Sequence, residues 1–179
     1  MKFDMTGENA IRELLDREAI RDCLYRYCRA IDRCDGDLLL SVYWPGANDD
    51  HGTWSGPVEE FVPFVIPVLE SRQQTSHRIT NVLIRIDGDE ARVESYFDAY
   101  ERPVRKDGTP NDVTVNGRYL DRFERRDGEW RIADRKVVTD AFRVWKDSAD
   151  WERGLYGTVL PMGARREEDA SAALLGDLS

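Results

Sequence analysis

The sequence has 179 residues, of which 41% are hydrophobic and 34% charged, and its formal net charge at pH 7 is −9. This length and composition are typical of a single globular domain with one core. An acidic surface repels phosphate backbones, so no binding of nucleic acid is expected. The chain contains neither an apolar run long enough to cross a bilayer nor a basic amphipathic run, so no membrane contact is expected.

The N-terminal stretch MKFDMTGENA lacks the apolar segment of a secretory signal, and we expect a cytoplasmic protein. The three cysteines, Cys23, Cys28 and Cys34, are odd in number and match no common zinc spacing. We interpret them as residues that pack in a helix. With two histidines and no acidic-histidine cluster, no catalytic metal is expected.

The first predicted element is a helix over residues 8–33, where apolar residues recur at helical spacing and form one buried stripe. Asp35 and Gly36 should end this helix, with Gly36 as its left-handed terminator. Asp37 should then cap a short helix over residues 38–43.

A loop over residues 46–56 should follow, with a short strand near His51–Trp54. A third helix is expected from Pro57 to about Ser71. Pro63 and Pro67 should kink or break it, because proline removes a backbone donor.

After residue 75 the apolar period changes to two, which is typical of strands. Two Asp-Gly pairs between alternating runs indicate hairpins. The sequence therefore predicts a four-stranded antiparallel meander, whose strands read ITNVLIRI, ARVESYFDAY, VTVNGRYLDRFERR and EWRIADRKVVTDAFRVW. Helices followed by strands indicate one α+β domain over residues 1–145. We expect the tail, 146–179, to be partly ordered or packed on the body or on a neighbouring subunit.

Two residues stand out as candidates for proton transfer. Asp32 lies on or beside the buried stripe of the first helix, although an ordinary surface carboxylate there is the simpler interpretation. His77 begins the first long strand, where it is either a structural histidine or, with a carboxylate partner, a general base.

The later strands carry further candidates. Alternation places Tyr96, Asp98 and Tyr100 on one face, which suits either a pocket with a few polar groups or a solvated outer face. The third strand places Val115, Gly117 and Tyr119 on one face, where Gly117 indicates a bend or a close approach. The last strand places Arg135 and Thr139 together, with the arginine either paired or available to an anion.

Four segments together resemble the SnoaL-like branch of the nuclear transport factor 2-like superfamily. They are DREAIRDCLYRYCRAIDRCDGDLL, the GxWxG pattern at 52–56, TSHRITN, and GRYLDRFERRDGEWRIADRKVV. The resemblance covers about residues 9–145. It implies a cone: a strongly curved antiparallel sheet, wrapped by N-terminal helices, around an apolar cavity.

The resemblance also implies site residues. Dehydratases and a dehydrochlorinase of this group use a cavity Asp–His pair as the base, and Asp32 and His77 occupy the matching positions. An arginine five residues after the Trp of the final strand matches Arg135. The chain departs from the group at Tyr27, where the dehydrochlorinase has a lysine, and at Tyr100, where a dehydratase has a carboxylate that Asp98 would have to replace.

From the residues and the resemblance we expect a lyase, such as a dehydratase, or an isomerase that acts without a cofactor on a small apolar organic molecule. Tyr27, Tyr100 or Arg135 would stabilise developing negative charge. The alternative is a non-catalytic binding or assembly subunit, like the small subunit of ring-hydroxylating dioxygenases. A homo-oligomer, dimer or trimer, is expected, because Phe142, Val144, Trp145 and Trp151 would expose apolar surface in a monomer.

Overall fold

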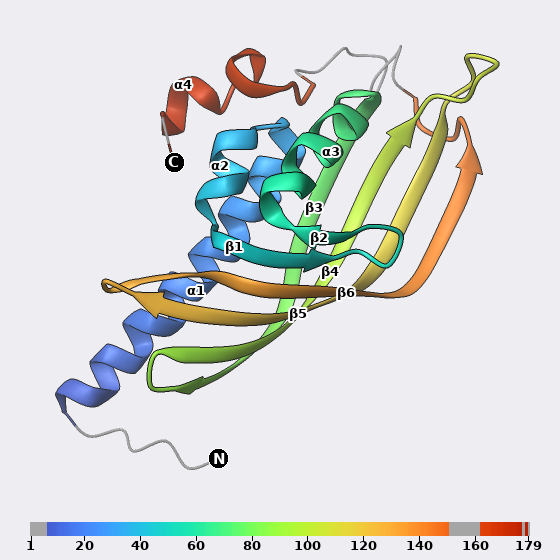
Figure 1. The fold of residues 1–179 in the computed structure, drawn as a ribbon. Helices are drawn as coiled ribbons and strands as arrows, with labels where there is room; N and C mark the ends of the chain where they lie inside the picture. Colours follow the sequence, from blue (N-terminus) through green and yellow to red (C-terminus); the bar gives the residue numbers. More distant parts are fainter. Residues whose placement is uncertain (1–6, 151–161, 177, 179) are drawn as a thin grey trace.

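The computed structural model of the protein describes residues 7–150, 162–176 and 178. Its elements combine helices and one sheet, which confirms the α+β class (Figure 1). The helical elements are α1 (Glu8–Arg33), α2 (Gly36–Ser41), α3 (Val58–Glu70), the short 3-10 turn η2 (Arg166–Glu168) and α4 (Ala172–Leu175). The strands are β1 (Tyr43–Asp50), β2 (Ser55–Pro57), β3 (Arg72–Asp87), β4 (Glu90–Pro103), β5 (Asn111–Arg126) and β6 (Glu129–Lys146).

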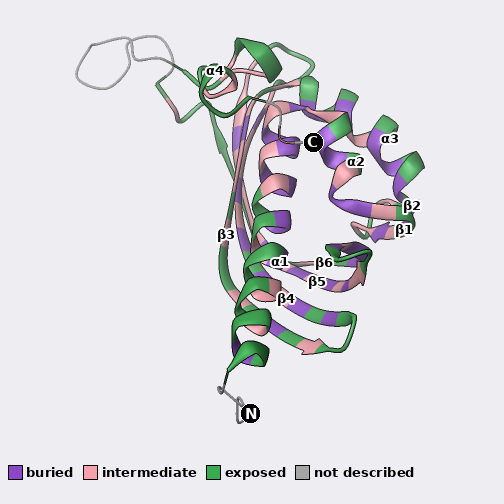
Figure 2. Ribbon diagram, turned by 90° about the vertical axis from the view of Figure 1, so that its left-hand side faces the viewer, coloured by how far each residue is buried: buried purple, intermediate pink, exposed green. Residues whose placement is uncertain are grey.

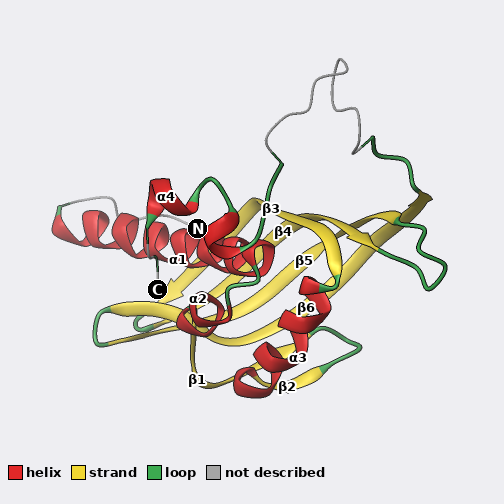
Figure 3. Ribbon diagram, turned by 90° about the horizontal axis from the view of Figure 1, so that it is seen from above, coloured by secondary structure: helices red, strands yellow, loops and turns green. Residues whose placement is uncertain are grey.

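The sheet has the order β2-β1-β6-β5-β4-β3. Strands β3 to β6 form the predicted antiparallel meander. The second Asp-Gly pair makes its turn with both residues in the left-handed region, with φ of 52° at Asp127 and 86° at Gly128. Long strands that curve together leave a concave side, and the helices lie on that side (Figure 3).

The prediction of four strands is incomplete, because β1 and β2 add to the sheet where a loop with a short strand near His51–Trp54 was expected. Residues 51–54 instead connect the two strands. Strand β1 reads YWPGANDD, a sequence with weak strand propensity. It is held by parallel pairing with β6, in which Asp49 lies opposite Arg135, and by antiparallel pairing with β2. The tertiary partner therefore decides this element.

The ends of the helices correct two expectations. Cys34, with φ of 55°, is the left-handed residue that ends α1, and Gly36 instead begins α2. Asp35 caps α2, because its carboxylate accepts a 3.0 Å hydrogen bond from the Leu38 backbone N–H. The predicted cap, Asp37, lies inside the helix.

Helix α3 is continuous, although Pro63 and Pro67 were expected to kink or break it. Both prolines lie four residues apart on its exposed face, so the carbonyl groups that lose their partners remain accessible to water. Buried residues on the opposite face, including Phe61 and Ile66, hold the helix against the core.

The core lies between the helices and the concave face of the sheet. Figure 2 shows β3 on one side of the molecule, α1 beside it, and β1, β2 and α3 on the other side. No helix within the described residues has both the length and the apolar character needed to span a membrane. Of the predicted apolar surface, Phe142 is 67% exposed, Val144 and Trp145 are also exposed, and Trp151 lies outside the described residues.

Candidate active site

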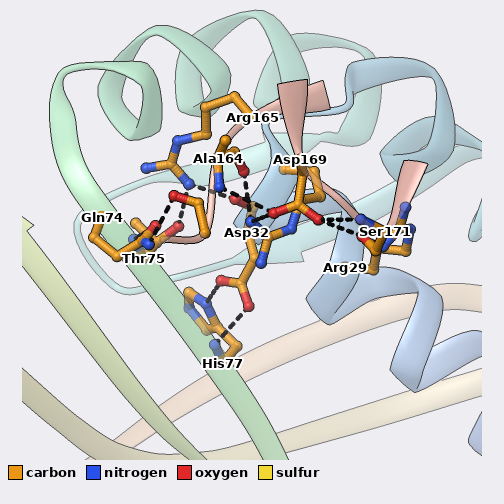
Figure 4. A network of polar contacts seen from close by, with 11 residues as sticks. Arg29, Asp32, Gln74, Thr75, His77, Ala164, Arg165, Asp169 and Ser171 are labelled. Carbon is orange, nitrogen blue, oxygen red and sulfur yellow. Dashed lines mark hydrogen bonds and ion pairs between the residues drawn. The ribbon is translucent and has the colours of Figure 1, made fainter. Parts of the chain in front are cut away.

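Asp32 and His77 contact each other through two hydrogen bonds. The His77 ring Nδ1 lies 2.7 Å from Asp32 Oδ1, and the His77 backbone N–H donates to Oδ2 at 2.8 Å (Figure 4). The carboxylate therefore holds both the ring and the backbone of the same residue. Such a contact fixes the orientation of an imidazole and leaves its Nε2 for another partner.

The fold explains why these residues meet. Asp32 lies in the last turn of α1 and is buried. His77 lies on β3, which ends the sheet order, so a backbone N–H on its outer edge has no neighbouring strand to bind. Asp32 accepts that N–H, and the edge of the sheet thereby aligns the histidine with the helix.

The pair lines a pocket of about 420 Å³ between α1 and β3. Cys28 and Ile79 contribute apolar walls, and the side chains of His77 and Asp32 are 9% and 10% exposed. Three arginines line the rest: Arg29, Arg33 and Arg78. The site is therefore a depression open to solvent, with arginine side chains around it.

The C-terminal segment contacts the same region, as Figure 4 shows. Arg165 donates to the main-chain carbonyl of Asp32 and, at 2.8 Å, to the hydroxyl of Thr75. Arg33 pairs with Asp169 at 2.9 Å, and Arg29 donates to the Ser171 hydroxyl. Sequence reasoning did not assign any of these tail residues to the site, because no spacing links them to Asp32.

Arg135, Tyr27 and Tyr119 lie together, but around Asp121 rather than around the dyad. Arg135 and Asp121 form a bidentate pair at 2.7 Å and both side chains are 0% exposed. The guanidinium carbon lies 4.0 Å from the Tyr27 ring centroid and 4.1 Å from that of Tyr119. Burial alone would lower the pKa of Arg135, but Asp121 raises it well above its usual value.

Burial raises the pKa of the Tyr27 and Tyr119 hydroxyl groups as well. Tyr27 and Arg135 were expected to stabilise developing negative charge, yet both are buried in the core, as is Tyr119. Asp121 was missed. Continuing the alternation of the third strand from Val115 through Tyr119 would have placed it on the same inner face.

Tyr96, Asp98 and Tyr100 lie on the outer face of β4, the second of the two alternatives that their alternation left open. The inner face carries Ala99, which lies opposite His77. Tyr100 donates to Asp112 at 2.6 Å, and burial is the main cause that raises its pKa to about 12.

Val115 and Thr139 have different positions on the inner side. Val115 lies opposite Ala99, in the same cross-strand row as His77, and is partly buried. Thr139 lies opposite Gly117 and is exposed. Of these two candidates, only Val115 shares a cross-strand row with His77.

A second His–Asp pair, which sequence reasoning also missed, lies on the wall formed by β1 and α3. Asp49 is fully buried and contacts the His51 ring Nδ1. The Tyr43 hydroxyl donates to the other carboxylate oxygen at 2.5 Å. The spacing of two residues between Asp49 and His51 is the signal that could have indicated a shared face.

Within the described residues no group of three or more His, Cys, Asp and Glu side chains has the arrangement of a metal site. Independently of this, the Asp32–His77 pair offers acid–base chemistry by side chains. A carboxylate that orients the imidazole leaves Nε2 to accept a proton from a bound molecule.

Comparison with known proteins places this geometry in a family. Among solved structures, a hexachlorocyclohexane dehydrochlorinase (LinA) Type2 matches with a TM-score of 0.72 and 19% identity, over 82% of this chain and 99% of its own. A candidate scytalone dehydratase from Novosphingobium aromaticivorans matches with a TM-score of 0.66 and 19% identity, over 73% and 88%. A Nostoc punctiforme protein with a cystatin-like fold matches at 0.59 and 20% identity, over 70% and 92%.

These likenesses establish the fold. No protein with a curated description matches the chain. The model of the SnoaL-like domain matches residues 12–136, which include both Asp32 and His77. The chain therefore belongs to the SnoaL-like family, with the cone-shaped fold of the nuclear transport factor 2-like superfamily.

Proposed function

We propose that the protein is a lyase that eliminates a small leaving group from an apolar organic molecule, with His77 as the general base. The observation that carries this proposal is the two-point contact between Asp32 and His77 at the wall of a pocket. The reaction needs no cofactor, because the imidazole itself can accept the proton.

The step follows from the geometry. His77 Nε2 accepts a proton from a substrate carbon, the electron pair of that C–H bond forms a C=C bond, and the leaving group departs with the pair of its own bond. Asp32 accepts the Nδ1–H and balances the imidazolium charge that forms. Arginines that line the pocket would favour an electron-rich substrate or a departing anion there.

An isomerase would use the same first step and return the proton to another atom. A non-catalytic assembly subunit would need no oriented imidazole beside a pocket of this size. The names of two structural neighbours, a dehydrochlorinase and a candidate scytalone dehydratase, support elimination as the reaction class.

The test is turnover of two probes, hexachlorocyclohexane and scytalone, by the full chain and by His77→Gln. We expect a loss on the order of 10²–10⁴-fold in kcat for the variant, while binding of the probe persists. Asp32→Asn should lose activity too, because it no longer orients the ring.

Asp37→Asn is the matched control, since Asp37 is exposed on α2 and contacts neither member of the pair. Normal turnover by His77→Gln would exclude this mechanism. If the unaltered chain converts neither probe nor related eliminable compounds, the assembly alternative becomes the better account.

A further inference from the structure

The C-terminal end of α1 leaves carbonyl groups that the helix cannot pair by itself. Two of these carbonyls, those of Ala30 and Ile31, accept hydrogen bonds from backbone N–H groups that follow the helix. The carbonyl of Asp32 accepts instead from a side chain of the tail, Nη1 of Arg165. A cation is favoured at this end of a helix, so the contact matches the charge of the helix dipole.

The Arg165 guanidinium also binds the strand that carries His77. Its Nη1 donates at 2.8 Å to the hydroxyl of Thr75, which lies on β3 just before His77 and is 1% exposed. Its Nη2 donates to the carbonyl oxygens of Leu69 and Arg72, at 3.4 Å each. All of these acceptors are uncharged oxygens, and the planar fork of one side chain thereby joins the last turn of α1 to the first residues of β3.

Asp32 is consequently held from two directions. Its main-chain carbonyl accepts from Arg165, while its carboxylate accepts from the backbone N–H of His77 and contacts the ring Nδ1. Figure 4 shows Asp32 between these two partners. The pocket is lined by residues of α1 and β3 together with Ser171, so Arg165 lies outside it and can affect a bound molecule only through the residues that it holds.

The tail around Arg165 is fixed by contacts of its own. The Asp169 carboxylate accepts a hydrogen bond at 3.0 Å from the backbone N–H of Ala164, the neighbour of Arg165 in the chain, and pairs with Arg33 at 2.9 Å. A hydrogen bond from the Ser171 hydroxyl, followed by that from Ala164, holds the pKa of Asp169 well below its usual value of 3.8. Arg165 therefore extends from a segment that is anchored to α1 by other residues.

We propose that Arg165 is a positioning residue for the elimination described above, because it fixes Asp32 relative to β3 and thereby sets the orientation of His77. The catalytic part of this inference rests on the proposed function. Without Arg165, the last turn of α1 and the start of β3 lose the link made by one rigid fork, and the carboxylate can shift away from the histidine. A displacement of about 1 Å in a reacting group can lower a rate by roughly 10²-fold.

The first test needs no substrate. The His77 backbone N–H donates to the Asp32 carboxylate, so the rate of its hydrogen exchange reports how firmly Asp32 is held. We expect Arg165→Gln to accelerate the exchange of this amide on the order of tenfold, the factor that corresponds to one hydrogen bond to a charged group, measured by NMR on the full chain. Amides of β4 and β5 report the stability of the whole sheet and should change clearly less. An equal acceleration at all of these amides would show a purely structural role and overturn the inference.

Arg166→Gln is the matched control, because it removes the neighbouring arginine of the same tail. Arg166 donates to the Cys34 carbonyl at 3.1 Å and pairs with Glu70 at 2.7 Å, and neither partner belongs to the dyad or to β3. Weaker docking of the tail should affect both variants alike, whereas we expect the His77 amide to respond to Arg165 alone. Equal acceleration of that amide in the two variants would contradict the inference.

The second test is turnover of the two probes named above. Arg165→Gln should lose on the order of 10–10²-fold in kcat and keep KM near the unaltered value, because Arg165 lies outside the pocket. Arg165→Lys should recover part of kcat, since an ammonium can donate to the Asp32 carbonyl or to the Thr75 hydroxyl but does not provide the planar fork. An unchanged kcat in Arg165→Gln, or a change in KM alone, would overturn the inference.

The failures of the two proposals are distinguishable. If His77→Gln keeps its turnover, the proposed base is excluded, while the exchange rate of the His77 amide still decides whether Arg165 fixes the pair. Thr75→Val covers the case in which Arg165→Gln does not fold, because it removes only the β3 end of the contact and keeps the shape of the side chain. We expect it to accelerate exchange of the His77 amide by a smaller factor. Unchanged exchange in the variants that fold would overturn the inference.

Discussion

Two carboxylates in this molecule hold a nitrogen partner at the same distance of 2.7 Å, yet they do different things. Asp121 and Arg135 are 0% exposed and are enclosed by the rings of Tyr27 and Tyr119. The Asp32–His77 pair is about one-tenth exposed and lines a pocket. Accessibility, and not the strength of the contact, separates a structural pair from one that can perform chemistry.

The two pairs also differ in what each partner does when the other is lost. A buried guanidinium without its carboxylate cannot lose its charge and must remain unsolvated. An imidazole without its carboxylate can be neutral, and water reaches it through the pocket. The predictions below test this difference, beginning with the largest expected effect.

Removing Asp121 should destabilise the fold most. Asp121→Ala leaves Arg135 charged and buried, and we expect the free energy of unfolding to fall by about 3–5 kcal/mol, measured by urea denaturation. Asp32→Ala should cost clearly less, because its partner can become neutral. Equal losses in the two variants would contradict the distinction drawn between the pairs.

The next prediction concerns how tightly the buried core is packed around Gly117. A Cβ added there would lie 2.3 Å from the Val138 carbonyl oxygen and 2.8 Å from the Phe97 ring, which stacks on Tyr119. Gly117→Ala should therefore cost about 1–3 kcal/mol, again by urea denaturation. This contact also confirms the close approach predicted from the glycine in mid-strand. Gly36→Ala is a control for overpacking, because a Cβ added there would make ordinary contacts at 3.4 Å to Val62 and 3.8 Å to Ile66.

Asp112 is a third carboxylate to compare, and it accepts a hydrogen bond from Tyr100, which lies on the outer face of the sheet. Burial alone would raise the pKa of Asp112, but hydrogen bonds from Tyr100, Ser148 and Arg102 outweigh burial and hold it well below the usual value of 3.8. A carboxylate with a depressed pKa in the folded state stabilises the fold above its unfolded pKa, and this contribution is lost as pH falls below about 4.

Unfolding of Asp112→Asn measured between neutral and strongly acidic pH should therefore show a shallower loss of stability than the unaltered chain. Asp87→Asn is the control, because Asp87 is an exposed carboxylate at the end of β3. Parallel curves for the unaltered chain and Asp112→Asn would mean that this carboxylate does not account for the acid sensitivity.

The cysteines of α1 give the smallest effect. Burial raises the pKa of Cys23 and of Cys28 to about 12 in each case, and Cys28 lines the pocket while Cys23 does not. Little thiolate exists at neutral pH, so both should react slowly with a thiol reagent in the native chain and rapidly after unfolding. Any native reaction should occur at Cys28 first. Faster labelling of Cys23 than of Cys28 would show that the buried core around Cys23 opens in the native state.

Much of the fold followed from local pattern. The period of two, interrupted by Asp-Gly pairs, predicted the hairpins from β3 to β6, and the apolar stripe predicted α1. Strand β1 could not be predicted in the same way, because its residues have little strand propensity and its partner, β6, lies about eighty residues later in the chain.

The candidate site, like the fold, could be predicted from the sequence only in part. Asp32 and His77 were identified from their positions and from the resemblance, and the structure brings them together. For the Tyr96 face the choice between pocket and outer surface stayed open, since alternation defines two faces without saying which one is inside; the structure places it outside. Arg135 was expected to be either paired or available to an anion; the structure pairs it with Asp121, which only the contact between them identified.

The sequence by itself determined the periodicity of the elements, the turns between the long strands and the residue types able to transfer a proton. These depend on neighbours a few positions apart. The tertiary structure alone decided which face of the sheet is enclosed, which carboxylate meets which cation or imidazole, and how the tail reaches Asp32. Those outcomes depend on curvature and on pairing between distant segments, and they set the solvent access that distinguishes the Asp32–His77 pair from the buried Asp121–Arg135 pair.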